Sequence, residues 1–258
     1  MMIKAAFFDV DGTLLSHATH VVSESTRRAL KALKEKGVLL IVATGRHICQ
    51  FQHLDVNDLA FDGYLTLNGQ ICLDGNREIL YGCPLQGKSK DTLLNMFREK
   101  EMPVLLVEEE GIYINMINDR VKYVQDCISS PVAEVKQYHG GELYMVCTYT
   151  APEEEHLLGQ AWEDCEITRW NPYALDIIAK GGGKDVAIRK YLETMGISRE
   201  ETIAFGDGQN DAGMLQYAGI GVAMGNADEA VKAIADFVTT DVDDNGIENA
   251  LKHFGLID

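Results

Sequence analysis

The sequence predicts an α/β fold in which a doubly wound, Rossmann-like parallel sheet carries an inserted α+β cap domain. Two observations support this prediction. Near both ends of the chain, short apolar runs alternate with helix-forming segments, which is the pattern of β-α-β units. Between these parts, residues 83–182 follow a different order of helices and strands. With 258 residues, the chain is long enough for a large domain and an insert.

The first part of the chain alternates strands and helices and ends in a hairpin. The apolar run at residues 3–8 is typical of a strand buried on both faces. Ser23 can cap the helix that follows, and Gly37 can end it. The predicted elements are, in order, a strand at 3–8, a helix at 24–36, a strand at 38–43, a helix at 47–55, a strand at 64–67 and a hairpin at 70–81.

The middle of the chain has an α+β order, with strands that follow one another instead of alternating with helices. The predicted elements are a helix at 89–101, strands at 104–107 and 111–116, a helix at 119–129, a strand at 142–148, a helix at 153–162 and strands at 166–170 and 174–178. We therefore assign residues 83–182 to an inserted domain.

After the glycines at 181–183, the alternation of helix and strand returns. The predicted elements are a helix at 184–195, a strand at 202–205, a helix at 210–217, a strand at 220–223, a helix at 227–235, a strand at 237–239 and a helix at 246–254. Residues 1–82 and 183–258 are therefore expected to form one core domain.

Composition narrows the classes of protein that fit. The hydrophobic content of 46% and charged content of 24% are ordinary for a globular domain. A formal net charge of −17 argues against a nucleic-acid partner and against an anionic membrane surface. We find no signal peptide or membrane-length apolar run, and the six cysteines are scattered without a C-x-x-C. We therefore expect a cytoplasmic protein. The sequence leaves both a monomer and a homodimer open.

Two carboxylates follow the first strand. Asp9 and Asp11 are two residues apart, so on an extended segment both face the same small volume. Carboxylates that close repel each other unless a cation or a shared proton relieves them. A polar turn after a strand would also place Asp and Gly here, so this stretch alone leaves both interpretations open.

Polar residues also follow other predicted strands or begin the next helix. They are Thr44, Arg46, Lys184, Asp207, Asn210 and Asp211. In a doubly wound sheet, such positions line one crevice at the carboxyl ends of the strands. Carboxylate oxygens suit a hard cation such as Mg²⁺, while the ammonium, guanidinium, hydroxyl and turn N–H groups suit a phosphate. This combination predicts phosphoryl transfer, and it supplies local positive charge to an acidic protein.

These motifs resemble those of the haloacid dehalogenase superfamily. The four matching stretches are Asp9-Val10-Asp11-Gly12-Thr13-Leu14, Thr44-Gly45-Arg46, Lys180…Lys184 and Gly206-Asp207-Gly208-Gln209-Asn210-Asp211. The insert lies between the second and third of them. Together with Asn68-Gly69 and Ala223-Met224-Gly225-Asn226-Ala227, it resembles the Cof-type phosphatase branch, which has a type IIB cap. The resemblance covers essentially the whole chain.

The resemblance implies a role for each acidic residue. Asp9 would be the nucleophile that takes the phosphoryl group as an aspartyl phosphate. Asp11 would protonate the leaving oxygen and then deprotonate the attacking water. Mg²⁺ would be held by the Asp9 carboxylate, the Asp11 backbone carbonyl and Asp207. Asp211 would contact the residues that bind the metal, without binding it directly, or would pair with Lys184.

The resemblance also implies phosphate-binding residues. Thr44, Gly45, Lys184 and Asn210 would hold the phosphoryl group, and Arg46 and Asn68 are candidates for substrate contact or support of the site. Some of these residues have simpler explanations that stay open. Thr44 can cap a helix, Arg46 can form a structural ion pair, and Asp211 can be a helix cap. The histidines show no metal-binding spacing and are expected in the core or on the surface.

The predicted function is hydrolysis of small phosphorylated metabolites, with sugar and polyol phosphates expected and the cap choosing among them. A dehalogenase would not need Asp11, and the segment 15–22 is too short for the cap that mutases of the superfamily use. Ion-pumping ATPases of the superfamily carry Thr in place of Asp11 and span membranes. Two alternatives remain: a phosphotransferase with the same intermediate, and a non-catalytic sensor of a phosphate ligand.

Overall fold

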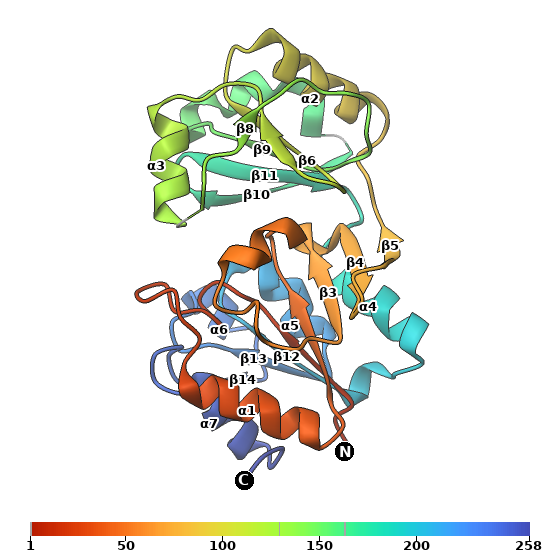
Figure 1. Ribbon diagram of the computed structural model, residues 1–258, viewed down its shortest axis with the longest axis vertical. Helices are drawn as coiled ribbons and strands as arrows, with labels where there is room; N and C mark the ends of the chain where they lie inside the picture. The colour runs from red at the N-terminus through yellow and green to blue at the C-terminus, as the bar shows by residue number, and fades with distance from the viewer. Residues whose placement is uncertain (1, 129, 163) are drawn as a thin grey trace. The chain divides into compact units, whose positions relative to one another are not determined.

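The computed structural model describes residues 2–128, 130–162 and 164–258. The chain divides into two compact units (Figure 1). The first, which we call the core unit, comprises Met1–Tyr81 and Gly183–Asp258. The second, the inserted unit, comprises Gly82–Gly182. The fold is mixed α/β with parallel strands at the centre of the core sheet, as the sequence predicts.

The core unit is built on an eight-stranded sheet with the order β14-β13-β12-β1-β2-β3-β4-β5. Its strands are β1 (Ala5–Phe8), β2 (Leu39–Ala43), β3 (Gly63–Thr66), β4 (Ile71–Asp74), β5 (Ile79–Gly82), β12 (Thr202–Gly206), β13 (Ile220–Ala223) and β14 (Phe237–Val238). All pairs from β14 to β3 are parallel, while β4 is antiparallel to β3. Because β1 lies between β2 and β12, the strand order reverses there, and such a switch point opens a crevice at the carboxyl ends.

Helices accompany the core sheet. They are α1 (Glu24–Glu35), α4 (Lys184–Met195), α5 (Ala212–Tyr217), α6 (Glu229–Lys232) and α7 (Gly246–His253), with short 3₁₀ helices η1 (Ile48–His53), η2 (Leu67–Gly69), η4 (Arg199–Glu201) and η5 (Gln209–Asp211). The Ser23 hydroxyl caps α1 by accepting a hydrogen bond from the Thr26 N–H. Gly196 ends α4 in the left-handed conformation.

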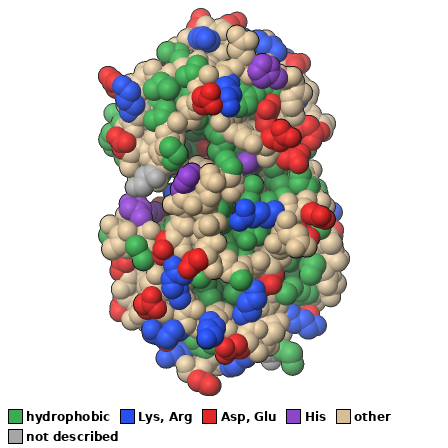
Figure 2. All heavy atoms as spheres, viewed as in Figure 1, with side chains coloured by type: hydrophobic (Ala, Val, Ile, Leu, Met, Phe, Trp, Pro, Cys, Tyr) green, Lys and Arg blue, Asp and Glu red, His purple; other side chains and the backbone are tan. Residues whose placement is uncertain are grey.

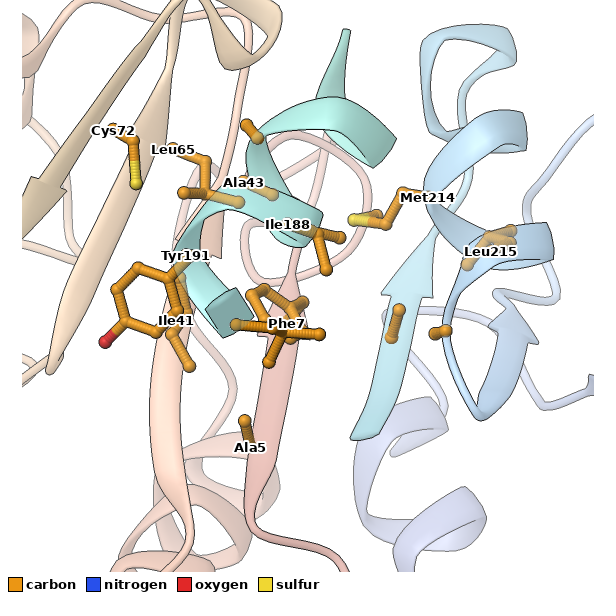
Figure 3. Close-up of a cluster of buried hydrophobic side chains, with 14 of the residues drawn as sticks. Ala5, Phe7, Ile41, Ala43, Leu65, Cys72, Ile188, Tyr191, Met214 and Leu215 are labelled. Atoms are coloured by element: carbon orange, nitrogen blue, oxygen red, sulfur yellow. The ribbon is translucent and has the colours of Figure 1, made fainter. Parts of the chain in front are cut away.

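One face of the core sheet is packed by α4 and α5. Phe7 and Ile41 project from neighbouring strands into a cluster with Ile188 and Tyr191 of α4 and Met214 of α5 (Figure 3). Because side chains alternate across a strand, Phe8 faces the opposite side, where it stacks on Phe205. This burial on both faces explains why the strands are continuous apolar runs.

Helix α1 packs against β2 and α7 and carries four basic residues on its outer side. Arg27 pairs with Asp55 and Asp58, and Lys34 pairs with Asp62. Basic and acidic side chains are accordingly interspersed on the face of the core unit drawn in Figure 2.

The inserted unit is a six-stranded sheet with the order β10-β11-β9-β6-β7-β8. Its elements are α2 (Gly87–Glu99), β6 (Val104–Glu108), β7 (Ile112–Ile114), α3 (Asp119–Cys127), β8 (Glu134–Val135), β9 (Leu143–Thr148), η3 (Pro152–Trp162), β10 (Cys165–Asn171) and β11 (Ala174–Ala179). Its core joins Phe97 and Leu158 to Leu106, Val146 and Ile177 of the sheet. All its strand pairs are antiparallel except β7 with β8.

Local structure departs from the prediction in a few places. The helices expected at 47–55 and 153–162 are 3₁₀ helices, and the one expected at 227–235 shortens to the single turn α6. In η1 only Phe51 is buried, so little apolar surface supports a longer helix. Strand β8 was not predicted, because its two residues are exposed and carry no apolar alternation. The final residue of the helix predicted at 119–129 lies outside the described residues. Within the described parts of the chain, no helix is both long enough and apolar enough to cross a membrane.

Candidate active site

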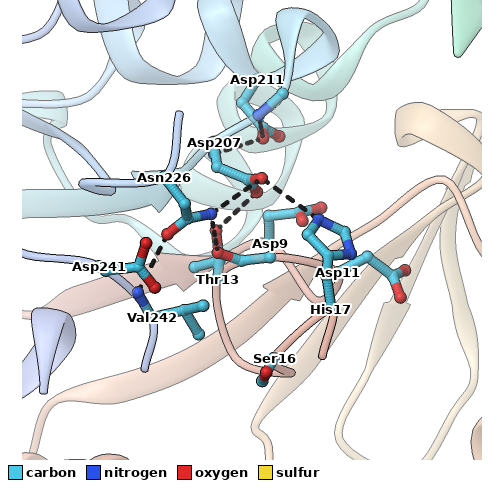
Figure 4. A network of polar contacts seen from close by, with 12 residues as sticks. Asp9, Asp11, Thr13, Ser16, His17, Asp207, Asp211, Asn226, Asp241 and Val242 are labelled. Carbon is cyan, nitrogen blue, oxygen red and sulfur yellow. Dashed lines mark hydrogen bonds and ion pairs between the residues drawn. The ribbon is translucent and has the colours of Figure 1, made fainter. Parts of the chain in front are cut away.

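The sequence-predicted acidic residues meet at the carboxyl ends of β1 and β12 in the core unit (Figure 4). Asp9 follows β1 directly, and its backbone N–H donates to the Phe205 carbonyl at 3.0 Å, which continues the β1–β12 pairing into the turn. Asp207 follows β12, and Asp211 ends the 3₁₀ turn after it. Carboxylate oxygens of Asp9, Asp207 and Asp211 lie within 4.8 Å of one another.

Gly12 allows the loop after β1 to pass close to the Asp207 carboxylate. Its φ of +83° is unfavourable for residues with a side chain, and a Cβ atom there would overlap Oδ2 of Asp207. The glycine of the first motif thus turns the chain and lets the loop pass against the Asp207 carboxylate.

Lys184 is buried between two of the acids. Its Nζ donates to Asp9 Oδ1 at 2.6 Å and to Asp211 Oδ1 at 2.5 Å. Burial by itself would lower the pKa of Lys184, but the charges of Asp211 and Asp9 raise it, so the ammonium stays protonated. Asp211 Oδ2 accepts the backbone N–H groups of Asp207 and Gly208, so both Asp211 oxygens already have donors. Asp211 thus pairs with Lys184 and accepts the Gly208 N–H at the start of η5, but in the described part of the chain its side chain makes no capping hydrogen bond to α5.

Asp9 has an unusual electrostatic environment. Burial is the largest influence on its carboxyl, followed by repulsion from Asp211, and together they raise its pKa well above the ordinary value despite the attraction of Lys184. Counting Asp11 and Asp207 as well, four carboxylates share the site with two cationic side chains, Lys184 and Arg46. Two negative charges are thus left unbalanced when all four acids are ionised, which is the charge that a divalent cation would offset.

Asp11 is held by Arg46 through two hydrogen bonds. Nε of Arg46 donates to Asp11 Oδ2 at 2.7 Å, and an Nη atom donates to Oδ1 at 2.8 Å. Burial alone would lower the pKa of Arg46, but its hydrogen bonds and charge interaction with Asp11 raise it. Such paired contacts fix the orientation of a carboxylate as well as its position. The ion-pair alternative for Arg46 therefore applies, and its partner is the proposed acid–base residue.

The remaining predicted residues gather beside β2 and β3. Thr44 is buried after β2, and its Oγ1 accepts the Arg46 backbone N–H at 3.1 Å. Asn210 donates through Nδ2 to Asn68 Oδ1 at 2.9 Å, which joins the fourth motif to the turn after β3. Gly45 lies against the same Asn68 amide, where a Cβ would come within 3.2 Å of Oδ1. All ten predicted site residues thus belong to the core unit.

Three residues of the site were not singled out from the sequence. Thr13 donates to Asp207 Oδ1 at 3.1 Å, and Asn226 donates to Asp207 Oδ2 at 3.3 Å (Figure 4). His17 lies 3.7 Å from the same Oδ2, and this contact raises its pKa against the effect of burial. Thr13 and Asn226 stand in motifs that the sequence displays, whereas His17 has no local signal. His17 lies on the surface, as expected of the histidines, but beside the acidic cluster.

The acidic cluster fits a hard metal ion. Asp211 is committed to Lys184 and two backbone N–H groups, so the carboxylates of Asp9 and Asp207 are the ones left to face a cation. Among the described residues, the side-chain donor to Asp9 reaches only its Oδ1. Oxygen donors of this kind suit Mg²⁺, which binds through one or two carboxylates together with water and substrate phosphate.

Comparisons with known proteins identify the class. The model of the haloacid dehalogenase-like hydrolase family matches residues 6–251. The chain is 32% identical to a Bacillus subtilis protein named "Putative phosphatase YkrA", over 98% of each chain. The structure of the HAD subclass IIB sugar phosphatase BT4131 is 39% identical, with a TM-score of 0.87 over 98% of this chain and all of that one. The phosphatase BT1666 from Bacteroides thetaiotaomicron is 34% identical, with a TM-score of 0.89 over 99% of this chain and 96% of that one.

The chain belongs to the haloacid dehalogenase-like hydrolase family. It is a phosphatase of that superfamily, in the branch to which the subclass IIB structures belong. Phosphorylated compounds are the substrates of this class. Because the chain is an enzyme of this class, the alternative of a non-catalytic sensor no longer applies.

Proposed function

We propose that the protein hydrolyses phosphate monoesters of small polar metabolites, sugar or polyol phosphates among them, through an aspartyl phosphate on Asp9. The observation that carries this proposal is the buried Asp9 carboxylate, which Lys184 holds beside Asp207 and Asp211. A carboxylate in this position can attack a phosphorus atom whose negative charge is offset by neighbouring cations.

In the first step, a carboxylate oxygen of Asp9 bonds to phosphorus while the bond from phosphorus to the ester oxygen breaks. Asp11 gives its proton to that departing oxygen. Because Asp11 pairs with Arg46 through both oxygens, we propose that substrate binding releases it to take up and donate this proton. In the second step, Asp11 removes a proton from water, the water oxygen bonds to phosphorus, and the bond to Asp9 breaks.

The phosphoryl group would be bound by the residues around Asp9. Lys184 supplies a fixed charge, and the hydroxyl of Thr44, the N–H of Gly45 and the amide of Asn210 supply hydrogen bonds. Asn68 positions Asn210 through its own amide.

We propose Mg²⁺ as the metal, held by the carboxylates of Asp9 and Asp207 and by the Asp11 backbone carbonyl. When bound, it neutralises negative charge and polarises the phosphoryl group. The surplus of carboxylates over cationic side chains supports this assignment.

We propose that the inserted unit, residues 83–182, is the cap that selects the substrate. The subclass IIB relative is named a sugar phosphatase, and a Bacillus subtilis relative with 28% identity, YcsE, is named a 5-amino-6-(5-phospho-D-ribitylamino)uracil phosphatase. Both names describe phosphate esters of polyhydroxylated carbon chains, which supports that substrate class here. We also propose a cytoplasmic location, which the six free thiols support.

The test is phosphate release from p-nitrophenyl phosphate and from a panel of sugar, polyol and nucleoside phosphates. We expect turnover with Mg²⁺ that EDTA removes, and none with Asp9→Asn. Adding glycerol separates hydrolysis from transfer, because a phosphotransferase would form glycerol phosphate in place of free phosphate. Turnover that persists in Asp9→Asn would contradict the proposed nucleophile, and predominant glycerol phosphate would favour the transferase alternative.

A further inference from the structure

We propose that Asn226, together with Thr13, is a positioning residue for the metal-binding carboxylate of Asp207. This inference rests on the metal site proposed above and goes beyond it, because neither residue touches the proposed metal or substrate. It follows from the contacts of one side-chain amide, which joins three segments far apart in the sequence (Figure 4).

Asn226 stands just after β13, and each polar atom of its amide has a partner. Nδ2 donates to the Gly12 carbonyl at 2.8 Å and to Asp207 Oδ2 at 3.3 Å. Oδ1 accepts the backbone N–H of Val242 at 3.0 Å. An amide has two N–H donors and an acceptor oxygen, and only asparagine offers this set at this length. Asn226 thus ties the turn after Asp9, the carboxylate of Asp207 and the loop at 240–246 together.

Asp207 receives a donor on each oxygen. Thr13 Oγ1 donates to Oδ1 at 3.1 Å, and Asn226 donates to Oδ2. A carboxylate has about four lone-pair positions, so each oxygen keeps capacity for a cation on its other side. Two donors on two oxygens also define the rotation of the carboxylate plane, which a single donor would leave open. The acid is therefore presented toward Asp9 before any cation arrives.

A second partner for the same carboxylate oxygen lies close by. The imidazole of His17 is 3.7 Å from Oδ2, and its side chain is 66% exposed. When Asn226 releases Oδ2, the exposed His17 imidazole remains as a partner toward which the Asp207 carboxylate can rotate. Metal binding would then have to restore the orientation, and part of the binding free energy would be lost.

The loop at 240–246 has other anchors, which allows Asn226 to be changed without unfolding it. The Gly225 N–H donates to the Thr240 carbonyl at 2.9 Å, and the Thr239 N–H donates to the Ala223 carbonyl at 3.0 Å. Asn249 offers a matched control. Its Nδ2 donates to Thr240 Oγ1 at 2.8 Å and to the Asp244 carbonyl at 3.1 Å, so it holds the same loop without reaching Asp207.

The experiment is calorimetric titration of the full-length protein with Mg²⁺, and with Mn²⁺ as a second probe, in the absence of substrate and at fixed pH. We expect Asn226→Ala and Thr13→Val to weaken metal binding by roughly 10- to 100-fold, the range typical for residues that orient ligands. Thr13→Ser restores the hydroxyl and should recover most of the affinity. Asn249→Ala should stay within about twofold of the wild type, since it leaves both donors to Asp207 in place.

Circular dichroism confirms that each variant is folded before titration, and Thr13→Val carries the test if Asn226→Ala does not fold. Unchanged affinity in the folded variants would overturn the inference and leave the metal site standing. An equal loss in Asn249→Ala would also overturn it, because loop integrity would then be the cause. A wild type that binds neither cation would overturn both this inference and the metal component of the proposed function.

Discussion

Replacing Asp9 by asparagine should abolish turnover and at the same time stabilise the metal-free protein. Asparagine has nearly the same shape as aspartate, and its Oδ1 can still accept the hydrogen bond from Lys184. What it removes is a buried negative charge whose neighbours include Asp207 and Asp211. The proposed nucleophile thus lowers the free energy of unfolding of the protein that carries it.

The magnitude follows from the competing interactions. With an effective dielectric constant of about 20, each repulsion amounts to at least roughly 3.5 kcal/mol, its value at the upper limit of 4.8 Å, and the attraction of Lys184 at 2.6 Å amounts to roughly 6 kcal/mol. Two repulsions and one attraction therefore nearly cancel, and the cost of burying the charge decides the sign. We expect Asp9→Asn to raise the free energy of unfolding by on the order of 2 kcal/mol. For a chain of this size, that corresponds to an increase in Tm of about 4–8 °C.

The effect depends on pH in a defined direction. Because the folded-state pKa of Asp9 lies above its ordinary value of 3.8, the penalty is absent below pH 3.8 and grows as pH rises through the folded-state pKa. The advantage of Asp9→Asn should therefore be larger at pH 8 than near pH 4.

The assay is thermal unfolding in EDTA, followed by calorimetry or circular dichroism, for the wild type and Asp9→Asn at both pH values. Glu35→Gln is the control: it removes an exposed carboxylate that faces Lys31 and should change stability by less than about 1 kcal/mol. A Tm for Asp9→Asn at or below that of the wild type at pH 8 would refute the reasoning, because burial would then not make ionised Asp9 costly.

Three further predictions address other parts of the structure. Arg46→Ala should lower kcat/KM for alkyl phosphates by at least tenfold more than for p-nitrophenyl phosphate. The reason is that nitrophenolate leaves without a proton, whereas an alkoxide needs the proton that a correctly held Asp11 supplies. Equal losses for both substrates would argue against this role. Asp211→Asn should lower the free energy of unfolding by about 1–3 kcal/mol in urea titrations, because its NH2 group would face either Lys184 or the N–H groups of Asp207 and Gly208 and leave them without an acceptor; an unchanged free energy of unfolding would contradict that. Burial raises the pKa of Cys72 to about 12, so its thiol should not react with Ellman's reagent at pH 8 until the protein unfolds, and rapid reaction in the native state would show that the site is open.

The sequence predicted those parts of the fold that local physics determines. The buried strands around Asp9 are continuous apolar runs, and α4 begins and ends where Lys184 and Gly196 suggest. That η1 is a 3₁₀ helix could not be predicted from the sequence, because the conformation of this weakly apolar segment depends on its contacts with the rest of the chain.

The candidate site divides in the same way. The carboxylates of the first and fourth motifs could be predicted, because they stand near glycines just after apolar strands. Arg46 and Lys184 were also predicted as site residues, but not their pairing with Asp11 and Asp9, because these contacts span 35 and 175 residues of the chain. Asn226 and His17 reach Asp207 only through the folded chain, so no spacing rule could reveal either contact.

The most direct test of the central claim is to trap the covalent intermediate. The protein is mixed with a sugar phosphate and Mg²⁺, quenched in acid within one turnover, digested and examined by mass spectrometry. We predict a phosphoryl group on Asp9 in the wild type, more of it in Asp11→Asn, where the base that hydrolyses it is missing, and none in Asp9→Asn. Phosphate release without an adduct on Asp9 in either active protein, or an adduct on another residue, would contradict the account.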